Sequence, residues 1–532
     1  MLLKRHARTH ARDLNGQTPL HIAARRGNRD MIQLIIDHGG DVDVRDNSRS
    51  TPLHMASRYK SPKAAQLLVE RGANVRARNS KGETPLHMAS SYRYPDIMQL
   101  FLDQGVDVDV RDKKGLTPLH RALDGSKLEA ALLLLNCGAN LHLRDKNGQT
   151  VLHHASQGGC IDIMQLLVDQ GLDVNAQDKL HSTPLHLAAR CQDPEAALKA
   201  VQLLLECGAN VHVRNNDGET LLHAASYRRH IDVMRLLLFQ GVDVNAQGGY
   251  KHSTALHLTS QSSPRPVVRE AVQLLLECGA NVHVRNDYSE TPLHLASHGG
   301  FSGDMHLDVM RLLLDQGVDV NAQDRYHSTA LHLALQNQLT KAAQLLLERG
   351  ANIHVRNNYG TTPLHLASRG AYPHIMRLLL DQGVDVNAQD KDHSTALHQA
   401  SQTWSAKADE AVQLLLGCGA NIHVRDNVGR TPLHFASRDG FLDVMRLLLD
   451  QGVDVNAQDK NHRTPLHMAS QRGALGAAEL LLERGANVRA LTKYGRSPLR
   501  FAETQAMKRL LSFHEHSGKK SSIYNSFLRP FK

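Results

Sequence analysis

A tetrapeptide, Thr-Pro-Leu-His or a close variant, recurs along this chain at a spacing near 33 residues. Its first residue occupies fifteen positions, namely Thr18, Thr51, Thr84, Thr117, Thr150, Thr183, Thr220, Thr254, Thr291, Thr329, Thr362, Thr395, Thr431, Thr464 and Ser497. Nine of the fourteen steps are 33 residues long, and the other five range from 34 to 38. A fixed period of this size predicts a repeat array in which each unit buries its apolar face only against its neighbours. We therefore expect one elongated body whose function is binding.

The segment 429–463 illustrates what one repeat builds. Thr431 is a good helix N-cap, and Pro432 suits the first helical position because its missing amide would be unpaired there anyway. A short first helix should end at Gly440. A second helix over 443–450 should follow, and its expected core-facing residues are Val444, Leu447 and Leu448.

These residues resemble the ankyrin repeat, whose pattern reads G-x-TPLH-x-A, then a glycine, then LLL and GA. The match runs from about Leu2 to about Leu511. The resemblance implies an all-α repeat solenoid of about fifteen stacked helix-turn-helix repeats with β-hairpin tips. It also implies that the inner helices and tips line a concave binding face, and that the motif Thr and His form hydrogen bonds within and between repeats.

The repeat register divides the chain into four segments. Residues 1–13 align with the end of a repeat, residues 14–496 hold repeats 1–14, residues 497–516 form a degenerate C-terminal capping repeat, and residues 517–532 form a basic tail. Because terminal repeats normally need a polar cap and none precedes residue 2, we expect a longer product or a misplaced start codon.

The formal net charge of +9 is concentrated at the two ends of the chain. Residues 1–150 hold 24 basic and 16 acidic residues, whereas residues 151–496 carry a net charge of −4. Part of the N-terminal charge is a row of arginines six residues before the motif threonine, namely Arg12, Arg45, Arg78, Arg111 and Arg144. A charge confined to the ends argues against nucleic acid bound along the whole surface, which would need a continuous basic stripe.

The cysteines indicate a reducing compartment. Four of the six stand thirteen residues before a motif threonine, namely Cys137, Cys207, Cys278 and Cys418. Equivalent positions two repeats apart should lie ~20 Å apart, which exceeds the roughly 7 Å reach of a disulfide. The chain shows no signal-peptide core and no long apolar stretch. We therefore expect no membrane segment and a cytoplasmic or nuclear location.

The 34 histidines invite a catalytic or metal-binding interpretation that their positions do not favour. Fourteen belong to the repeat motif, and five replace a turn glycine, namely His181, His252, His327, His393 and His462. The turn histidines recur in every second repeat, so neighbouring ones should lie ~20 Å apart, which is too far for them to share a metal ion. Asp178-x-x-His181-Ser182 recurs on other turns, whereas a catalytic triad needs one sequestered set. We expect no catalytic residue, no metal and no cofactor.

Tyrosine gives the best candidates for binding, because it offers a large contact area at little entropic cost. Turn and first-helix-end positions supply the expected contact ridge of Tyr227, Tyr250, Tyr288, Tyr326 and Tyr359. The alternative is that tyrosine lies outside because it does not fit the Leu/Ala core. Near the N-terminus, a second and basic patch is expected from Arg25, Arg26, Arg58 and Tyr59.

Insertions between the two helices of some repeats are the other departure from the period. One of them carries Trp404, which is either a binding anchor or packs over a neighbouring helix. Taken together, the sequence predicts a non-catalytic, monomeric scaffold or adaptor that binds a protein partner on its concave face. Three alternatives stay open: the recognition arm of a larger effector-bearing protein, a substrate adaptor for ubiquitin ligation and, as the weakest, nucleic-acid binding through the first five repeats.

Overall fold

A computed structural model describes residues 9–92, 94–125, 127–261, 266–298 and 305–516. The described residues form 30 α-helices and one short 3-10 helix, η2 (Tyr250–His252). They contain no β-strand, only the isolated bridges Arg144–Thr150 and Gly248–Ser253. The predicted all-α repeat architecture is confirmed, and the tips expected as β-hairpins are tight turns instead.

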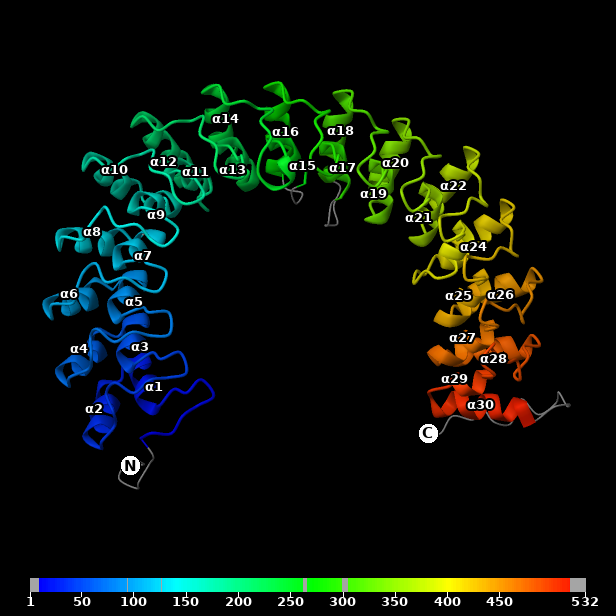
Figure 1. Cartoon of the computed structure of the whole chain (residues 1–532), viewed down its shortest axis with the longest axis horizontal. Helices are drawn as coiled ribbons and strands as arrows, with labels where there is room; N and C mark the ends of the chain where they lie inside the picture. The colour runs from blue at the N-terminus through cyan, green and yellow to red at the C-terminus, as the bar shows by residue number, and fades with distance from the viewer. Residues whose placement is uncertain (1–8, 93, 126, 262–265, 299–304, 517–532) are drawn as a thin grey trace. The chain divides into compact units, whose positions relative to one another are not determined.

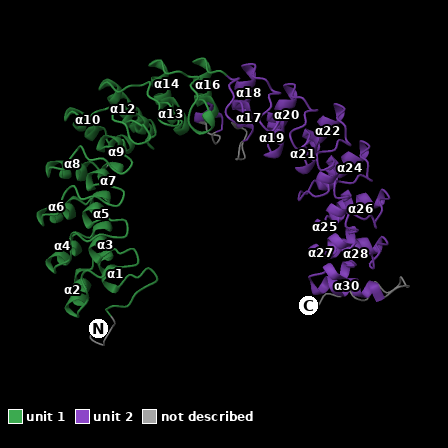
Figure 2. Cartoon of the chain, in the orientation of Figure 1, with its two compact units in different colours: residues 1–259, 270–281 green, residues 260–269, 282–532 purple. Residues whose placement is uncertain are grey.

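The chain divides into two compact units (Figure 2). Unit 1 comprises residues 1–259 and 270–281, and unit 2 comprises residues 260–269 and 282–532. Within each unit the first helices of successive repeats pack against one another, and the second helices form a parallel layer beside them (Figure 1). Each repeat therefore buries its apolar residues against the repeats before and after it.

The helices of residues 9–281 belong to the first eight repeats. Their first helices are α1 (Pro19–Arg26), α3 (Pro52–Arg58), α5 (Pro85–Tyr92), α7 (Pro118–Asp124), α9 (Val151–Gly158), α11 (Pro184–Ala189), α13 (Leu221–Arg228) and α15 (Ala255–Ser260). Their second helices are α2 (Arg29–Asp37), α4 (Pro62–Glu70), α6 (Pro95–Asp103), α8 (Leu128–Asn136), α10 (Ile161–Asp169), α12 (Pro194–Glu206), α14 (Ile231–Phe239) and α16 (Pro266–Glu277).

The remaining helices belong to unit 2. The first helices are α17 (Pro292–Ser297), α19 (Ala330–Gln336), α21 (Pro363–Arg369), α23 (Ala396–Ala400), α25 (Pro432–Asp439), α27 (Pro465–Arg472) and α29 (Pro498–Phe501). The second helices are α18 (Met305–Asp315), α20 (Thr340–Glu348), α22 (Pro373–Asp381), α24 (Ala408–Gly417), α26 (Leu442–Asp450), α28 (Leu475–Glu483) and α30 (Gln505–His516).

Each first helix begins at the motif threonine for a reason visible in α3. Thr51 has extended backbone angles, Pro52 takes the first helical position, and the Thr51 N–H donates to Nδ1 of His54 at 3.1 Å. The other ring nitrogen of His54, Nε2, lies 3.0 Å from the carbonyl oxygen of Glu83, which belongs to the next repeat. This confirms the predicted N-cap and the structural role of the motif histidine.

The turns between repeats explain the Asp-x-x-His-Ser pattern. The Asp178 carboxylate accepts backbone N–H groups from Leu180 and Ser182 at 2.8 and 2.9 Å, which closes the turn. His181 sits in that turn with φ of 57°, a left-handed conformation that the other repeats usually give to glycine. The turn histidines at 252, 327, 393 and 462 also have positive φ, as predicted. The pattern is therefore a turn motif.

The core stripe of the second helix differs in one position from the prediction. In α26 the buried residues are Val444, Met445 and Leu448, whereas Leu447 is only half-buried. The expectation for Leu447 is therefore wrong, and Met445 was missed. The helix contacts its neighbours through positions i, i+1 and i+4, which places the residue before Leu448 at the edge of the interface.

The insertions are absorbed in different ways. The one at residues 191–200 mostly lengthens a helix, because α12 starts at Pro194, with Asp193 as its N-cap, and spans 13 residues. Most of this insertion is therefore helical and does not form a loop between the two helices. Residues 262–265 and 299–304, in two other insertions, lie outside the described residues. Around Trp404 the chain does form a loop, between α23 and α24.

The predicted arginine row links adjacent repeats through the backbone. Arg12 donates to the carbonyl oxygen of Arg45 at 2.8 Å, and Arg78 donates to that of Arg111 at 2.7 Å. In unit 2, Arg425 donates in the same way to the carbonyl oxygen of Gln458 at 2.6 Å. These guanidinium groups therefore stabilise the stacking of turns.

The end of the described chain has the form of a shortened repeat. In α30, Met507 and Leu511 are buried, while Lys508 and Arg509 are exposed. A polar outer face is what a terminal repeat needs. The four segment boundaries stay predictions, since residues 1–8 and 517–532, which contain most of the two terminal segments, lie outside the described residues.

Candidate protein-binding surfaces

Three of the predicted ridge tyrosines stand on successive turns of unit 2. The backbone N–H of Arg325 donates to the carbonyl oxygen of Tyr288 at 2.9 Å, and that of Asn358 donates to the carbonyl oxygen of Tyr326 at 2.8 Å. These bonds join neighbouring turns directly, so that Tyr288, Tyr326 and Tyr359 follow one another along one edge of the unit. We call these three residues the turn tyrosines.

Arg325 fixes two of the turn tyrosines. Its guanidinium carbon lies 3.6 Å from the centre of the Tyr288 ring and 4.7 Å from that of Tyr326. Its Nη2 also donates to the Tyr326 hydroxyl, and this hydrogen bond raises the pKa of Arg325 above its ordinary value. Tyr288 is half-buried as a result, while Tyr359 is 63% exposed and has no such cover. Arg325, Tyr288 and Tyr326 thus form a contiguous aromatic–cationic surface.

The other two ridge tyrosines belong to unit 1. Tyr227, near the end of α13, and Tyr250, in η2, are 63% and 75% exposed. The ammonium group of Lys251 lies 5.4 Å from the centre of the Tyr250 ring. Both side chains are open to a partner, and a continuous ridge from Tyr227 to Tyr359 stays a prediction.

Three residues of the basic patch predicted near the N-terminus lie close together, namely Arg25, Arg58 and Tyr59. The guanidinium carbons of Arg25 and Arg58 lie 5.8 and 5.5 Å from the centre of the Tyr59 ring. Arg58 also lies 5.6 Å from the ring of Tyr92, which the prediction did not include. Arg26 is exposed beside Arg25 at the end of α1. Arginine and tyrosine therefore alternate across the ends of α1, α3 and α5.

Trp404 takes one of the two roles that the sequence left open, since it packs over a neighbouring helix, and its role as a binding anchor stays a prediction. Its ring meets that of Phe441 edge to face, with centres 5.0 Å apart and an angle of 79° between the planes. Even so, 80% of the residue is exposed. The indole is therefore supported from one side by α26 and free on the other.

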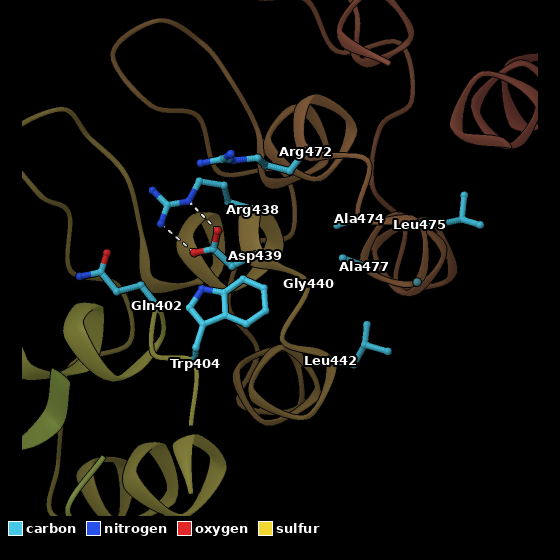
Figure 3. Close-up of a pocket in the computed structure, with 11 residues that line it drawn as sticks. Gln402, Trp404, Arg438, Asp439, Gly440, Leu442, Arg472, Ala474, Leu475 and Ala477 are labelled. Carbon is cyan, nitrogen blue, oxygen red and sulfur yellow. Dashed lines mark hydrogen bonds and ion pairs between the residues drawn. The ribbon is translucent and has the colours of Figure 1, made fainter. Parts of the chain in front are cut away.

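The free side of Trp404 faces a cavity of about 560 Å³ (Figure 3). Arg438 and Asp439 at the end of α25 and Arg472 at the end of α27 border it, as does Leu475 at the start of α28. A second cavity, of about 460 Å³, shares Arg438 and Arg472 with the first and adds Arg430, Arg463, Met468, Gln471 and Glu503. Together they form a groove across the first helices.

Sequence reasoning missed the arginines of this groove. Arg430 and Arg463 directly precede the motif threonine in two successive repeats, so their alignment was visible in the repeat register. Their proximity to Arg438, Arg472 and Trp404 was not visible, because it depends on how three repeats stack.

A buried charged cluster in unit 1 was also missed. His154 Nδ1 lies 2.5 Å from Asp124 Oδ1, and its Nε2 lies 3.7 Å from Asp145 Oδ2. Burial lowers the pKa of His154, but the hydrogen bond to Asp124 and the nearby carboxylate of Asp145 outweigh this effect and raise the pKa to about 9. The ring of His120 lies 4.8 Å away, edge to face. The signal was present, since His154 makes this the only repeat whose motif histidine is followed by another histidine.

Two features are absent from the part of the chain that the structure describes. No three His, Cys, Asp or Glu side chains there lie close enough together to hold a metal ion. None of the described helices combines the length and the apolar character needed to cross a membrane.

Comparisons with known proteins agree with the architecture. A family model described as ankyrin repeats (3 copies) matches residues 1–79, 124–210, 195–286, 266–357, 349–426 and 403–492. A second, described as ankyrin repeats (many copies), matches residues 68–122. These matches cover most of the chain.

Curated relatives share only short segments with it. The tyrosine-protein kinase Shark of Drosophila melanogaster is 35% identical over 112 residues, which is 20% of this chain and 11% of that protein. The nuclear factor NF-kappa-B p105 subunit of Gallus gallus is 34% identical over 107 residues, again 20% and 11%. Protein fem-1 homolog C of Homo sapiens is 31% identical over 82 residues, or 15% and 13%.

The chain thus spans only about a tenth of the length of the curated relatives it matches. The family models, by contrast, follow the repeat register that the helices and turns display along nearly the whole sequence. On these grounds the chain belongs to the ankyrin-repeat family.

Proposed function

We propose that this chain is a non-catalytic scaffold or adaptor that binds a protein partner through the face formed by its first helices and turns. The observation that carries the proposal is the set of exposed aromatic side chains on successive turns, above all Tyr326 and Tyr359. The sequence interpretation assigns this face to the concave side of the array.

The fixed position of the turn tyrosines supports this proposal. Backbone hydrogen bonds hold their turns together, and Arg325 holds the rings of Tyr288 and Tyr326. A partner that binds there has few groups to immobilise, so more of its contact energy is retained as affinity. Aromatic side chains in rigid settings are the residues that most often dominate protein interfaces.

A protein partner fits the surface better than a nucleic acid. Several N-terminal arginines that would otherwise attract phosphates, such as Arg12 and Arg78, donate to backbone carbonyls of the next repeat. The remaining basic patch around Arg25, Arg58 and Tyr59 is local. Duplex DNA would need phosphate contacts along an extended basic surface, with a steep dependence on salt.

The thiols support a reducing compartment. All six cysteines are free in the structure, and Cys160 and Cys191 are buried. Burial raises the pKa of the Cys191 thiol, which keeps it protonated and unreactive. We propose that the chain acts in the cytoplasm or nucleus as a monomer.

An affinity pull-down from nuclease-treated lysate, read by mass spectrometry, tests the proposal. The bait is compared with a variant that carries Tyr250→Ala, Tyr288→Ala, Tyr326→Ala and Tyr359→Ala. Proteins captured by the parent chain and lost from the variant would support the proposal. Circular dichroism establishes that the variant remains folded.

The matched control carries Phe239→Ala and Tyr494→Ala. Phe239 is an exposed aromatic residue at the end of a second helix, and Tyr494 is an exposed tyrosine on a turn outside the predicted ridge. The control should capture the same proteins as the parent chain. Identical capture by all three baits would refute the assignment of the binding surface, and capture of no protein at all would refute the function.

A further inference from the structure

A groove on unit 2 combines one exposed indole with four arginines. It joins the two cavities that share Arg438 and Arg472, and runs from Trp404 across the ends of α25 and α27 to the turns before these helices. Its apolar end is lined by Trp404, Leu442, Leu475 and Ala477. We call it the Trp404 groove, and Figure 3 shows the cavity at its apolar end.

Two of its arginines are held in place by carboxylates that lie beneath them. Arg430 Nε donates to Asp426 Oδ2 at 2.7 Å, and Arg463 Nε donates to Asp459 Oδ2 at 2.9 Å. The two aspartate side chains are 2% and 0% exposed, whereas the arginine side chains are 27% and 25% exposed. A guanidinium has five N–H donors, so part of each fork stays available at the surface. Solvent therefore contacts the arginine of each pair and not the aspartate.

The third arginine is fixed by a ring and a carboxylate. Arg438 forms a two-point contact with Asp439 through Nε and Nη2, at 3.0 and 2.7 Å. Arg430 and Arg438 both lie over the ring of Phe435, with guanidinium carbons 4.4 and 5.5 Å from its centre. These two cations are thus held side by side on one buried aromatic residue.

The fourth arginine lacks such a partner. Arg472 is exposed at the end of α27, and within the described residues no carboxylate pairs with it. It borders both cavities and so lies between the apolar end and the remaining arginines. An unpaired guanidinium flanked by three pre-positioned ones favours an anionic ligand, because Arg recognises carboxylates through two parallel hydrogen bonds.

We propose that the Trp404 groove binds an acidic peptide segment of a partner protein that carries an aromatic or large aliphatic side chain. The apolar side chain lies against Trp404 and Leu475, and carboxylates reach Arg472 and the open edges of Arg430, Arg438 and Arg463. This goes beyond the proposed function, since it assigns a second surface, in other repeats than those of the turn tyrosines, and the chemistry of its occupant.

A single-stranded nucleic acid could also stack a base on Trp404 and contact arginines. Two carboxylates that line the groove disfavour the binding of a nucleic acid. Asp439 borders the first cavity and Glu503 borders the second. A strand with a phosphate at every nucleotide would bring charge close to both, whereas a peptide can present a neutral residue there.

The test uses the fact that Trp404 is the only tryptophan of the chain. Short random peptides displayed on phage are selected on the full chain, and the most enriched one is synthesised without tryptophan. Its binding is followed through the emission of Trp404. We expect the selected peptides to combine acidic residues with an aromatic or large aliphatic residue.

Charge reversal identifies the site. Arg472→Glu should weaken binding of the selected peptide by at least about tenfold, the effect of one lost charge-assisted contact. The matched control is Arg377→Glu, the same change at an exposed position of α22 in the same unit, which should leave binding unchanged. Thermal unfolding followed by circular dichroism establishes that both variants fold.

Three outcomes would overturn the proposal. These are a selection that enriches no peptide, a consensus without acidic residues, and equal binding by the Arg472→Glu and Arg377→Glu variants. Stronger binding of an oligouridylate than of the peptide, in competition, would assign the groove to nucleic acid instead. None of these results depends on the pull-down that tests the turn tyrosines, so either proposal can be refuted without refuting the other.

Discussion

His54 Nε2 lies 3.0 Å from the carbonyl oxygen of Glu83, while its Nδ1 accepts the N–H of Thr51 at 3.1 Å. Nδ1 must therefore be unprotonated and Nε2 must carry the proton, which is the neutral form of the ring. One buried side chain thus caps its own helix and joins it to the next repeat. Most repeats contain the same arrangement, for example at His87, His332 and His434.

The first prediction is acid sensitivity. Burial lowers the pKa of His54, His87, His332 and His434 from 6.5 to about 4. Below pH 6.5 these histidines bind protons in the unfolded chain but stay neutral in the folded chain. The free energy of unfolding should therefore fall as the pH drops from about 6.5 to about 4. Each such histidine contributes about 1.4 kcal/mol per pH unit in this range. Urea denaturation followed by circular dichroism over this range measures the slope.

The exposed turn histidines serve as its control. Replacing His393 and His462 by Asn tests whether the acid slope arises from the buried motif histidines, since both turn histidines are exposed. A free energy of unfolding that stayed constant between neutral pH and about 5 would contradict the neutral, doubly bonded ring.

The second prediction concerns alkaline pH. The pKa of His154 is raised to about 9 by Asp124 and Asp145 against the opposing effect of burial. The contribution of His154 to the free energy of unfolding is therefore fully present below pH 6.5 and is lost as the pH rises through about 9. We expect on the order of 1–2 kcal/mol, discounted because Asp124 is partly exposed.

The measurement compares the parent chain with His154→Leu. The difference between their free energies of unfolding should shrink between neutral pH and pH 9 or above. The control is His153→Leu, because the pKa of His153 is lowered to about 4, so that its loss leaves the alkaline range unaffected. A pH-independent difference for His154→Leu would rule out a charged imidazole at this position.

The third prediction separates two adjacent leucines of α26. Leu448 is fully buried, so Leu448→Ala should reduce the free energy of unfolding by about 2–5 kcal/mol. Leu447 is half-buried, and Leu447→Ala should cost clearly less. Urea unfolding followed by Trp404 emission reports on this region, because Trp404 contacts Phe441 at the start of α26. Equal costs for the two changes would contradict the observed core stripe.

The fourth prediction concerns the turn at His393, where φ is 57°. Glycine adopts this conformation without strain, so His393→Gly should change the free energy of unfolding by less than about 1 kcal/mol. A β-branched side chain does not, and His393→Val should cost about 1–3 kcal/mol. Thermal unfolding of both variants checks the order, and a more stable valine variant would contradict the left-handed turn.

The sequence allowed the N-caps and the turn histidines to be predicted, because each depends on residues within four positions of one another, and it allowed the repeat to be predicted because the same motif recurs along the chain. Thr51 and His54, or Asp178 and His181, act within a single turn of the chain. Local spacing therefore carries enough information for these features.

Features that depend on stacking were harder to predict. Met445 is buried and Leu447 only half-buried, because the packing of the neighbouring helices determines which side of α26 faces the core. Most of the insertion at residues 191–200 is helical, because Asp193 caps a helix that begins at Pro194, within the insertion itself. The Trp404 groove draws on the loop before α24 and the ends of α25 and α27, so no local pattern announced it.

The most direct test of the proposed function is a calorimetric titration of a captured partner against single variants. Tyr326→Ala should weaken binding by about tenfold or more, as expected for a buried aromatic anchor, and Tyr494→Ala should leave the affinity unchanged. Affinity that is equal for the parent chain, Tyr326→Ala and Tyr359→Ala would contradict the assignment of the turn tyrosines as the contact surface.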